Sequence, residues 1–499
     1  MPSVADLIFV ALLCVLVFTP LSVRLLGDAG IGWHIRTGQQ ILATHAIPHM
    51  DSFSSTMAGK PWFAWEWFYD VVVGELEAKF SLNGVVWLTA IVIAAVFAWT
   101  FRLLIERATQ MCIALGLVLI ALSASTIHFL ARPHIVSWLL TLTWFWVLDS
   151  SERDSAASQK RLWLLPPLML LWVNLHGGWL VGFVLLGIFW LNAAWTWLRA
   201  KENSLQDLLA KISAAKRTRQ LMWVTLLSAV ATLANPYGWR LHAHVYSYLS
   251  NRFLMDHIDE FQSPNFHGVA PKFFLALLLI TLAALAFRGR ELRLSSVLTL
   301  LFAIYAGLYA SRNIPVSALL LVMILGPLLS SRASRASTQG FFHRMRNMEL
   351  KMRGHAWPVL AVLFTLYIAA NGGRLGSTLL MNAHFDPYRM PADAVNYLVG
   401  HDVKGPVLAP DYWGGYLIYR LHPKAQVVLD DRHDLYGEDF FKSYLKLIHV
   451  EPGWKDFLRG HASSCVVVPK QSALASVLAE SAEWKAIYSD NVAIIFIRR

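Results

Sequence analysis

Long apolar runs, separated by short polar clusters, dominate the first three quarters of the chain. Runs such as 85–100, 273–287 and 314–329 approach the ~20 apolar residues that a helix needs to cross a bilayer. The pattern predicts an α-helical integral membrane protein with about eleven transmembrane helices. The predicted spans are 6–26, 84–101, 112–130, 134–149, 161–174, 177–198, 220–235, 271–287, 294–310, 314–330 and 356–373.

The stretch 161–198 is either one helix with a tail or two short helices that turn at Asn174–Gly178 (NLHGG). Charge favours the turn. With eleven spans and the N-terminus inside, the inner loops carry nineteen Lys and Arg residues and the outer segments carry seven, in the sense of the positive-inside rule. The inner loops are then 102–111, 150–160, 199–219, 288–293 and 331–355.

The composition changes after the last span. From about residue 374 the apolar runs shorten and charged residues return. Strand-like runs at 406–409, 426–429, 464–469 and 492–497 alternate with helical stretches at 440–448 and 473–481, which predicts a soluble α/β domain with a largely parallel sheet. We therefore divide the chain into a transmembrane domain, 1–373, whose first outer loop is about 27–83, and an extracytoplasmic α/β domain, 374–499.

Composition and charge exclude several classes of protein. The chain has 499 residues, is 56% hydrophobic and only 15% charged, whereas soluble proteins carry about 25% charged residues. A net charge of +11 would suggest nucleic acid in a soluble protein. Here the basic residues mark cytoplasmic loops, so we expect no nucleic-acid partner. The three Cys residues are too few for a disulfide framework.

Unusual polar residues gather in the outer segments. Each has an ordinary structural explanation: Asp28 as a helix cap, Arg132 as a headgroup anchor, Asn174 and His176 as partners for free backbone groups at a helix break. Together they indicate a site, because ionisable groups at a membrane boundary are costly to place there. The binding candidates are His34, Arg36, Arg132, His134, Asn174, His176, Arg240 and Arg312.

This set of residues suggests phosphate chemistry. Arg and His at the outer interface suit a phosphate at headgroup level, and a neighbouring carboxylate can deprotonate an acceptor hydroxyl. A transporter would place carboxylates mid-membrane and show internal repeats, and neither is visible. Asp430, Asp431 and Arg432 follow a predicted strand and are either sugar ligands or a salt-bridged loop.

Several motifs resemble a bacterial group of multi-pass membrane proteins related to the GT-C type, polyprenyl-phosphate-sugar-dependent glycosyltransferases. The first-loop motifs are Gly27–Gly38 (GDAGIGWHIRTG), Ile47–Ser54 (IPHMDSFS), Gly59–Trp62 (GKPW) and Glu66–Trp67. The later motifs are Asn174–Gly178, Asn235–Gly238 (NPYG), Trp413–Tyr416 (WGGY) and Leu429–Arg432 (LDDR).

The resemblance implies a catalytic acid just after the first span, which points to Asp28, with Asp51 and Glu66 as further candidates. Several relatives have Asp-x-Asp here, whereas this chain has Asp28-Ala29-Gly30. The missing second acid argues against a bound divalent metal, which stays an alternative, and no other cofactor is expected.

We therefore expect a glycosyltransferase of the outer face of the bacterial cytoplasmic membrane. It would transfer a sugar from a polyprenyl-phosphate-linked donor to a glycan, lipid or protein acceptor. The alternatives are a non-catalytic scaffold or lipid-glycan binding protein of the same fold and, third, a transporter.

Overall fold

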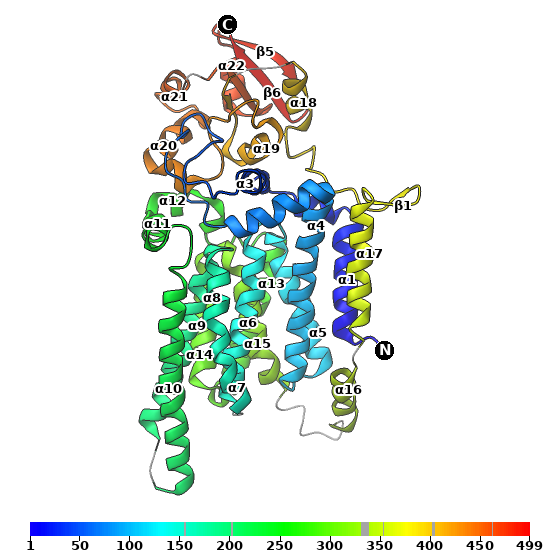
Figure 1. Ribbon diagram of the computed structural model, residues 1–499, viewed down its shortest axis with the longest axis vertical. Coiled ribbons are helices and arrows are strands. Elements are labelled where there is room, and N and C mark those ends of the chain that lie inside the picture. Colours follow the sequence, from blue (N-terminus) through cyan, green and yellow to red (C-terminus); the bar gives the residue numbers. More distant parts are fainter. Residues whose placement is uncertain (154–155, 201–202, 331–338, 353, 402–404, 462) are drawn as a thin grey trace.

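The computed structural model describes residues 1–153, 156–200, 203–330, 339–352, 354–401, 405–461 and 463–499. It is a bundle of upright helices with the C-terminal domain stacked on one end (Figure 1). We call this the domain end of the bundle. The N-terminus and α16 lie toward the opposite end.

A helix occupies each of the eleven predicted stretches. The helices of the bundle are α1 (Val4–Phe18), α2 (Leu21–Leu25), α4 (Trp67–Glu106), α5 (Met111–Ser125), α6 (His134–Glu152), α7 (Ala156–Arg161), α8 (Leu165–Val173), α9 (Leu180–Arg199), α10 (Leu205–Ala231), α13 (Val269–Arg288), α14 (Leu294–Tyr309), α15 (Ile314–Ser330), α16 (Gln339–Lys351) and α17 (Ala356–Ala370). Lying at the domain end are α3 (Ile31–Thr44), α11 (Trp239–Ser250) and α12 (Arg252–His257).

Fewer described helices are long and apolar enough to cross a membrane than the eleven spans that the sequence predicts. Five helical segments among the described residues are long and apolar enough to cross a membrane, or six if the bent pair Arg344–Lys351 and Ala356–Ala370 counts as one. Several predicted spans, such as α1 and α14, are apolar but shorter than 18 residues. Eleven crossings are therefore not confirmed, although the positions of the helices are.

The predicted turn at Asn174–Gly178 is present. α8 ends at Val173 and a single 3₁₀ turn, Gly177–Trp179, leads into α9. The basic loops that this turn implies do meet at the end opposite the domain, where Glu152 contacts Arg217 (2.7 Å) and Arg293 (3.5 Å). Residues 154–155, 201–202, 331–338 and 353 of the predicted inner loops lie outside the described part of the chain.

The first loop is folded rather than extended. α3 lies flat across the domain end, and α4 begins flat before it turns down into the bundle (Figure 1). Ser81 marks the bend, because its φ of 53° and ψ of −158° are not helical. The flat part of α4 therefore runs beside α3, and this arrangement positions the site described below.

The C-terminal domain contains one four-stranded sheet with helices around it. Its strands are β3 (Val407–Leu408), β4 (Cys465–Pro469), β5 (Trp484–Ser489) and β6 (Ala493–Arg498), in the order β3-β4-β6-β5. Its helices are α18 (Ala392–Gly400), α19 (Asp411–Leu421), α20 (His433–Ile448), α21 (Trp454–Gly460) and α22 (Ala473–Ala479). A short hairpin, β1 (Arg374–Leu375) and β2 (Thr378–Leu379), follows α17.

Two details of the predicted domain are wrong. The sheet is mixed and not largely parallel, since only β3 and β4 pair in parallel while β6 pairs antiparallel with β4 and β5. Residues 426–429 are not a strand of this sheet. Val427 instead forms isolated bridges to Val407 and to Ser54 of the first loop, because the first loop inserts beside it.

Candidate functional site

Glycines bring α3 into backbone contact with two other helices. A β-carbon on Gly38 would overlap the carbonyl oxygen of Asp70 in α4, and one on Gly32 would overlap the carbonyl oxygen of Gly415 in α19. Only glycine allows backbones to approach this closely. α3 is thus clamped between the flat part of α4 and the C-terminal domain.

His34 lies four residues before Gly38, so the two share a face of α3. This face meets α4, where the His34 Nδ1 atom lies 2.6 Å from Asp70 Oδ1. Both side chains are buried, with 1% and 0% of their surfaces exposed. The Trp33 indole stacks on the His34 imidazole at a ring-centroid separation of 3.6 Å. The orientation of the imidazole is therefore fixed on both sides.

Glu66 lies between two imidazoles. Its Oε2 atom is 3.8 Å from His34 Nε2 and its Oε1 atom is 3.7 Å from His176 Nε2. These distances are too long for hydrogen bonds. Within the described part of the chain, the Glu66 carboxyl group has no hydrogen-bond partner, although only 12% of the side chain is exposed.

Backbone contacts determine which nitrogen of His176 carries a proton. The Gly178 N–H donates to His176 Nδ1 at 3.0 Å, so Nδ1 has a free lone pair and Nε2 carries the hydrogen in the neutral ring. The Ser137 hydroxyl also contacts Nδ1 at 2.8 Å, and it accepts from the Trp172 indole at 2.7 Å. His176 therefore presents an N–H donor to Glu66.

Burial controls the charges at this centre. It raises the pKa of Glu66 to about 8, against the opposing effects of Arg132 and Arg312. Burial lowers the pKa of His176 to about 3, assisted by Arg312. Burial and then Arg132 hold the pKa of His34 well below its usual range. At pH 7 both imidazoles are neutral and Glu66 is largely protonated.

A second centre surrounds Arg132. Its Nη1 atom lies 3.0 Å from Asp431 Oδ2 and its Nε atom 3.6 Å from Asp28 Oδ2, and the Trp33 indole N–H donates to Asp431 Oδ1 at 3.0 Å. Burial raises the pKa of Asp431 to about 6, while Arg132 opposes the shift. A β-carbon on Gly30 would overlap the Arg132 guanidinium group. Because Trp33 and His34 are neighbours, the two centres meet at the first turn of α3.

The predicted site residues fall into four groups: members of the two centres, Arg312 beside them, residues with structural partners, and the exposed Arg240. The members of the two centres are Asp28, Arg132, His34, His176 and Glu66. Arg312 pairs with Glu260 at 3.2 Å, and it acts electrostatically on Glu66. Asp28 also accepts the Gly30 N–H at 2.8 Å, which is the expected helix-entry contact.

Other predicted residues have structural partners. The Arg36 guanidinium donates to the Tyr419 carbonyl. The Asn174 amide donates to the Ala234 carbonyl (3.0 Å) and accepts from the Trp67 indole (2.7 Å). His134 Nε2 contacts the His128 carbonyl at 2.9 Å, and Asp51 pairs with Arg432 at 2.8 Å. The Arg240 side chain is exposed on α11.

The LDDR motif forms the salt-bridged loop, and its binding of sugar stays a prediction. Arg432 donates twice to Asp430, at 2.8 and 2.7 Å, which is the salt-bridged loop. Asp431 instead reaches the Arg132 centre. Sequence reasoning missed Asp70 and Glu260. Asp70 lies four residues after Glu66, so helical spacing from Glu66 is the signal that could have indicated it.

The donor set of these centres does not suit a metal ion. Within the described residues, no group of three or more His, Cys, Asp or Glu side chains could hold one. His176 Nε2 carries its hydrogen, and the place of a cation between Asp28 and Asp431 is taken by Arg132. No reaction step is therefore assigned to a metal.

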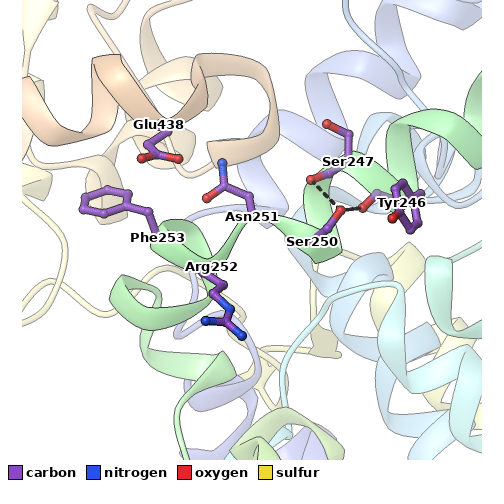
Figure 2. Close-up of a pocket in the computed structure, with 7 residues that line it drawn as sticks. All are labelled: Tyr246, Ser247, Ser250, Asn251, Arg252, Phe253 and Glu438. Atoms are coloured by element: carbon purple, nitrogen blue, oxygen red, sulfur yellow. Dashed lines mark hydrogen bonds between the residues drawn. The ribbon is translucent and has the colours of Figure 1, made fainter.

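A groove of about 800 Å³ lies elsewhere on the domain end. Figure 2 shows its lining side chains, which come from α11, α12 and the turn between them, with Glu438 of α20 opposite. It contains no residue of either centre. The Glu66 and Arg132 centres are defined by their contacts and not by this groove.

Solved structures that resemble the chain include two of oligosaccharyltransferases and one of ArnT. The oligosaccharyltransferase AglB from Archaeoglobus fulgidus, in complex with an inhibitory peptide and a dolichol-phosphate, has a TM-score of 0.57 and 12% identity over 93% of this chain and 69% of its own. A second Archaeoglobus fulgidus oligosaccharyltransferase structure, tethered with an acceptor peptide, has a TM-score of 0.57 and 12% identity over 99% of this chain and 74% of its own. ArnT from Cupriavidus metallidurans in the apo state has a TM-score of 0.50 and 14% identity over 98% and 97%.

The chain has the fold of the GT-C glycosyltransferases. No protein-family model and no curated protein matches the sequence. At these identities the likeness concerns the fold, and a fold by itself does not define a reaction. The chemistry must be argued from the two centres.

Proposed function

We propose that the protein transfers a sugar from a lipid-linked phosphosugar to an acceptor hydroxyl. The observation that carries this proposal is the Glu66 centre. Its carboxyl group is nearly buried, has no hydrogen-bond partner among the described residues, and is under the electrostatic influence of the Arg132 guanidinium. A carboxyl group in this environment serves a reaction better than it serves stability, because its burial is unfavourable.

Arg132 is the proposed donor-phosphate ligand. Guanidinium groups bind phosphate oxygens in bidentate fashion, and Arg132 keeps 20% of its side chain exposed. Asp28 and Asp431 hold it in place. The AglB structure contains a dolichol-phosphate, which supports a lipid phosphate as the kind of donor. Arg312 is the second proposed cation.

Glu66 is the proposed base, in preference to Asp28. A base works best when its pKa is near the operating pH, and burial raises the pKa of Glu66 to about 8. Asp28 Oδ1 accepts a hydrogen bond from the Gly30 N–H, and Asp28 Oδ2 pairs with Arg132. These contacts suit a role in holding Arg132. Asp51 is engaged with Ser54 and Arg432.

The reaction follows from these roles. Ionised Glu66 takes the proton of the acceptor hydroxyl, whose oxygen bonds to the anomeric carbon of the donor sugar. The bond between that carbon and the phosphate oxygen breaks, and its electron pair leaves with the lipid phosphate. Arg132 neutralises the charge that develops on the phosphate.

The proposed location is the outer face of a bacterial cytoplasmic membrane. The basic loops meet at the end of the bundle opposite the domain, and basic loops are typically cytoplasmic. This orientation places both centres and the C-terminal domain, 374–499, outside. Polyprenyl-phosphate sugars are the proposed donors there, and a glycan, lipid or protein is the acceptor.

Turnover in proteoliposomes tests the proposal. The purified protein is supplied with radiolabelled polyprenyl-phosphate sugars, and donor consumption, donor binding and movement of free sugar are measured. We expect donor consumption, and donor binding weakened by roughly 1.5–3 kcal/mol in Arg132→Gln. Lys79→Gln, an exposed basic residue of the flat part of α4, is the control.

Binding without consumption would instead support the scaffold reading. Movement of unmodified sugar across the bilayer would support transport. Either result would overturn glycosyl transfer.

A further inference from the structure

Asp70 has no role in the reaction described above. It is fully buried in the flat part of α4, its Oδ1 contacts His34 Nδ1 at 2.6 Å, and its Oδ2 atom is buried without a hydrogen-bond partner among the described residues. Asp51, another buried acid of the first loop, is better satisfied. Asp51 accepts from Ser54 and pairs with Arg432. A half-satisfied buried carboxyl group needs an explanation.

His34 connects this carboxyl group to Glu66. Its Nδ1 atom faces Asp70 and its Nε2 atom faces Glu66 Oε2 at 3.8 Å. A neutral imidazole carries one hydrogen on either nitrogen. It can accept a proton at Nε2 while it releases one from Nδ1, and it then connects two carboxyl groups without a lasting positive charge.

His176 is not a second route of this kind. Its Nδ1 atom accepts the Gly178 N–H and therefore has no hydrogen to pass on. The charged and titratable groups around the path are Tyr69, Arg132, His176, Arg432 and His134 near His34, and Arg132, Arg312, Asp434 and Glu260 near Glu66. Among the described residues, the charged groups that approach the Glu66 carboxylate within 4 Å are the imidazoles of His34 and His176.

We propose that Asp70 takes up the proton that Glu66 carries at rest, and that His34 passes it between them. This inference rests on the proposed function. The Glu66 O–H bond breaks as a bond to His34 Nε2 forms. The Nδ1–H bond of His34 breaks as a bond to Asp70 Oδ1 forms. Glu66 is then a carboxylate that can take the acceptor proton. When the product leaves, Glu66 releases the acceptor proton to water and the shared proton returns from Asp70 through His34.

The physical basis is that two nearby carboxyl groups in a buried site share a proton. Like charges disfavour double ionisation, so a single proton divides between Glu66 and Asp70 according to which state the substrate favours. Such groups titrate as a pair. His34 and Asp70 are positioning residues, since neither is assigned a contact with the substrate.

Asp70→Asn tests the relay, with Asp6→Asn as the matched control. Asp6 is also a buried acid, 4% exposed, in the N-terminal capping box of α1. We expect Asp70→Asn to lower kcat by about 10- to 100-fold, less than the 10²–10⁴-fold of losing a base, with donor Kd unchanged. The rate profile should then show the titration of a single carboxyl group, because the second member of the pair is gone. Unchanged kcat and pH profile would overturn the proposal.

His34→Gln provides the second variant, should Asp70→Asn fail to fold. It retains both acids but breaks the path, so it should lower kcat similarly. The double variant with Asp70→Asn should lose no more than His34→Gln alone, because residues that act as a unit are non-additive. Independent, multiplying losses would contradict the relay.

Infrared spectroscopy separates this proposal from the proposed function. At pH 7 the wild-type protein should show a protonated-carboxyl band that the Asp70→Asn/Glu66→Gln double variant lacks. Absence of that band in the wild type overturns proton sharing whatever the activity. Presence of the band without any donor turnover overturns glycosyl transfer and leaves a buried protonated carboxyl group that serves no reaction.

Discussion

Glu66 shows how a single residue can oppose the stability of the fold that contains it. Its carboxyl group is almost fully buried and has no hydrogen bond to any residue that the structure describes, so the folded state favours the protonated form. The unfolded chain has no such preference and ionises near pH 4.3. As the pH rises from this value toward about 8, the unfolded state gains stability relative to the folded state.

Glu66→Gln should therefore stabilise the protein at alkaline pH. We expect its midpoint of thermal unfolding in detergent to equal that of the wild type near pH 4.5 and to exceed it at pH 8.5. The difference is on the order of 1–4 kcal/mol, since one pKa unit corresponds to ~1.4 kcal/mol. A variant that is less stable than the wild type at pH 8.5 would show that Glu66 is a structural residue.

Gly30→Ala should weaken donor binding with little effect on folding. The added β-carbon overlaps the end of the Arg132 side chain and the Asp431 carboxylate, which are side-chain atoms that can move. We expect donor affinity to fall about as much as in Arg132→Gln, by roughly 1.5–3 kcal/mol, while thermal stability changes little. Gly187→Ala, where the β-carbon meets nothing within 4 Å, is the control. Unaltered donor affinity would remove Arg132 from the proposed donor site.

The sequence identifies which residues belong to the candidate site better than it identifies the environment of each one. Glu66, His34 and His176 can be selected from outer-loop motifs, and the structure brings them together. Their environment cannot be read in the same way. The raised pKa of Glu66 depends on burial, and the tautomer of His176 depends on one backbone N–H from Gly178. Both are products of tertiary packing.

At the scale of elements, α3 is the part that assembles the site. Its glycines contact α4 on one face and α19 on another, so His34 and Trp33 reach different centres from consecutive positions. The Arg36 guanidinium adds a contact to the Tyr419 carbonyl near the C-terminal end of α19, where a cation is favoured by the helix dipole.

Gly32→Ala should separate α3 from α19. The β-carbon would overlap the backbone of Gly415, which cannot move as a side chain can, and overpacking of this kind is destabilising by about 1–3 kcal/mol. We expect a lower thermal midpoint and parallel losses of donor affinity and turnover. Gly187→Ala, whose added β-carbon meets nothing within 4 Å, should leave the thermal midpoint unchanged or raise it slightly. A Gly32→Ala protein with wild-type stability would contradict the close crossing.

The positions of the helices can be predicted from the apolar pattern of the sequence, but the bends within helices cannot. Each predicted span coincides with a helix, because long apolar runs leave few alternatives to a helix. The bend at Ser81 and the flat part of α4 carry no comparable signal. The stretch 426–429 has the composition of a strand, but it forms only isolated bridges, one to Val407 of β3 and one to Ser54 of the first loop. Sequence patterns do not specify such distant partners.

At the scale of the whole molecule, the first loop and the C-terminal domain form one unit. The Thr56 hydroxyl donates to the Val428 carbonyl at 2.6 Å, and Ser55 and Val427 are joined through their backbones at 2.8 Å. Arg432 pairs with Asp430 and with Asp51 of the first loop, and both members of the latter pair are nearly inaccessible. The mixed sheet and this docking contact were beyond the reach of sequence patterns, since both depend on long-range pairing.

Arg432→Met should loosen the docking of the domain. It leaves two buried carboxylates uncompensated, which destabilises by about 3–5 kcal/mol. Arg459→Met is the control, because the Arg459–Asp456 pair is exposed and such pairs contribute about 0–1 kcal/mol. Thermal unfolding in detergent measures both. Equal effects of the two variants would contradict a buried docking pair.

The Asp51–Arg432 pair should also make the stability of the protein depend on pH in the acid range. Burial acts to raise the pKa of Asp51, but Arg432 and Ser54 hold it below its usual range. Its stabilisation is therefore present above the unfolded pKa of about 3.9 and is lost as the pH falls through the lower folded value. We expect the wild type, but not Arg432→Met, to lose this contribution on acidification below about pH 4, measured by thermal unfolding. An identical acid dependence in both proteins would contradict this assignment.

The most direct test of the central claim is a single-turnover comparison of Glu66→Gln with Asp28→Asn, using a labelled lipid-linked sugar and reconstituted protein. We predict that Glu66→Gln lowers the rate of transfer by about 10²–10⁴-fold while it binds the donor as the wild type does. Asp28→Asn should weaken donor binding through Arg132 and keep most of the transfer rate at saturating donor. Near wild-type transfer by Glu66→Gln, with transfer abolished in donor-saturated Asp28→Asn, would contradict the account and make Asp28 the base.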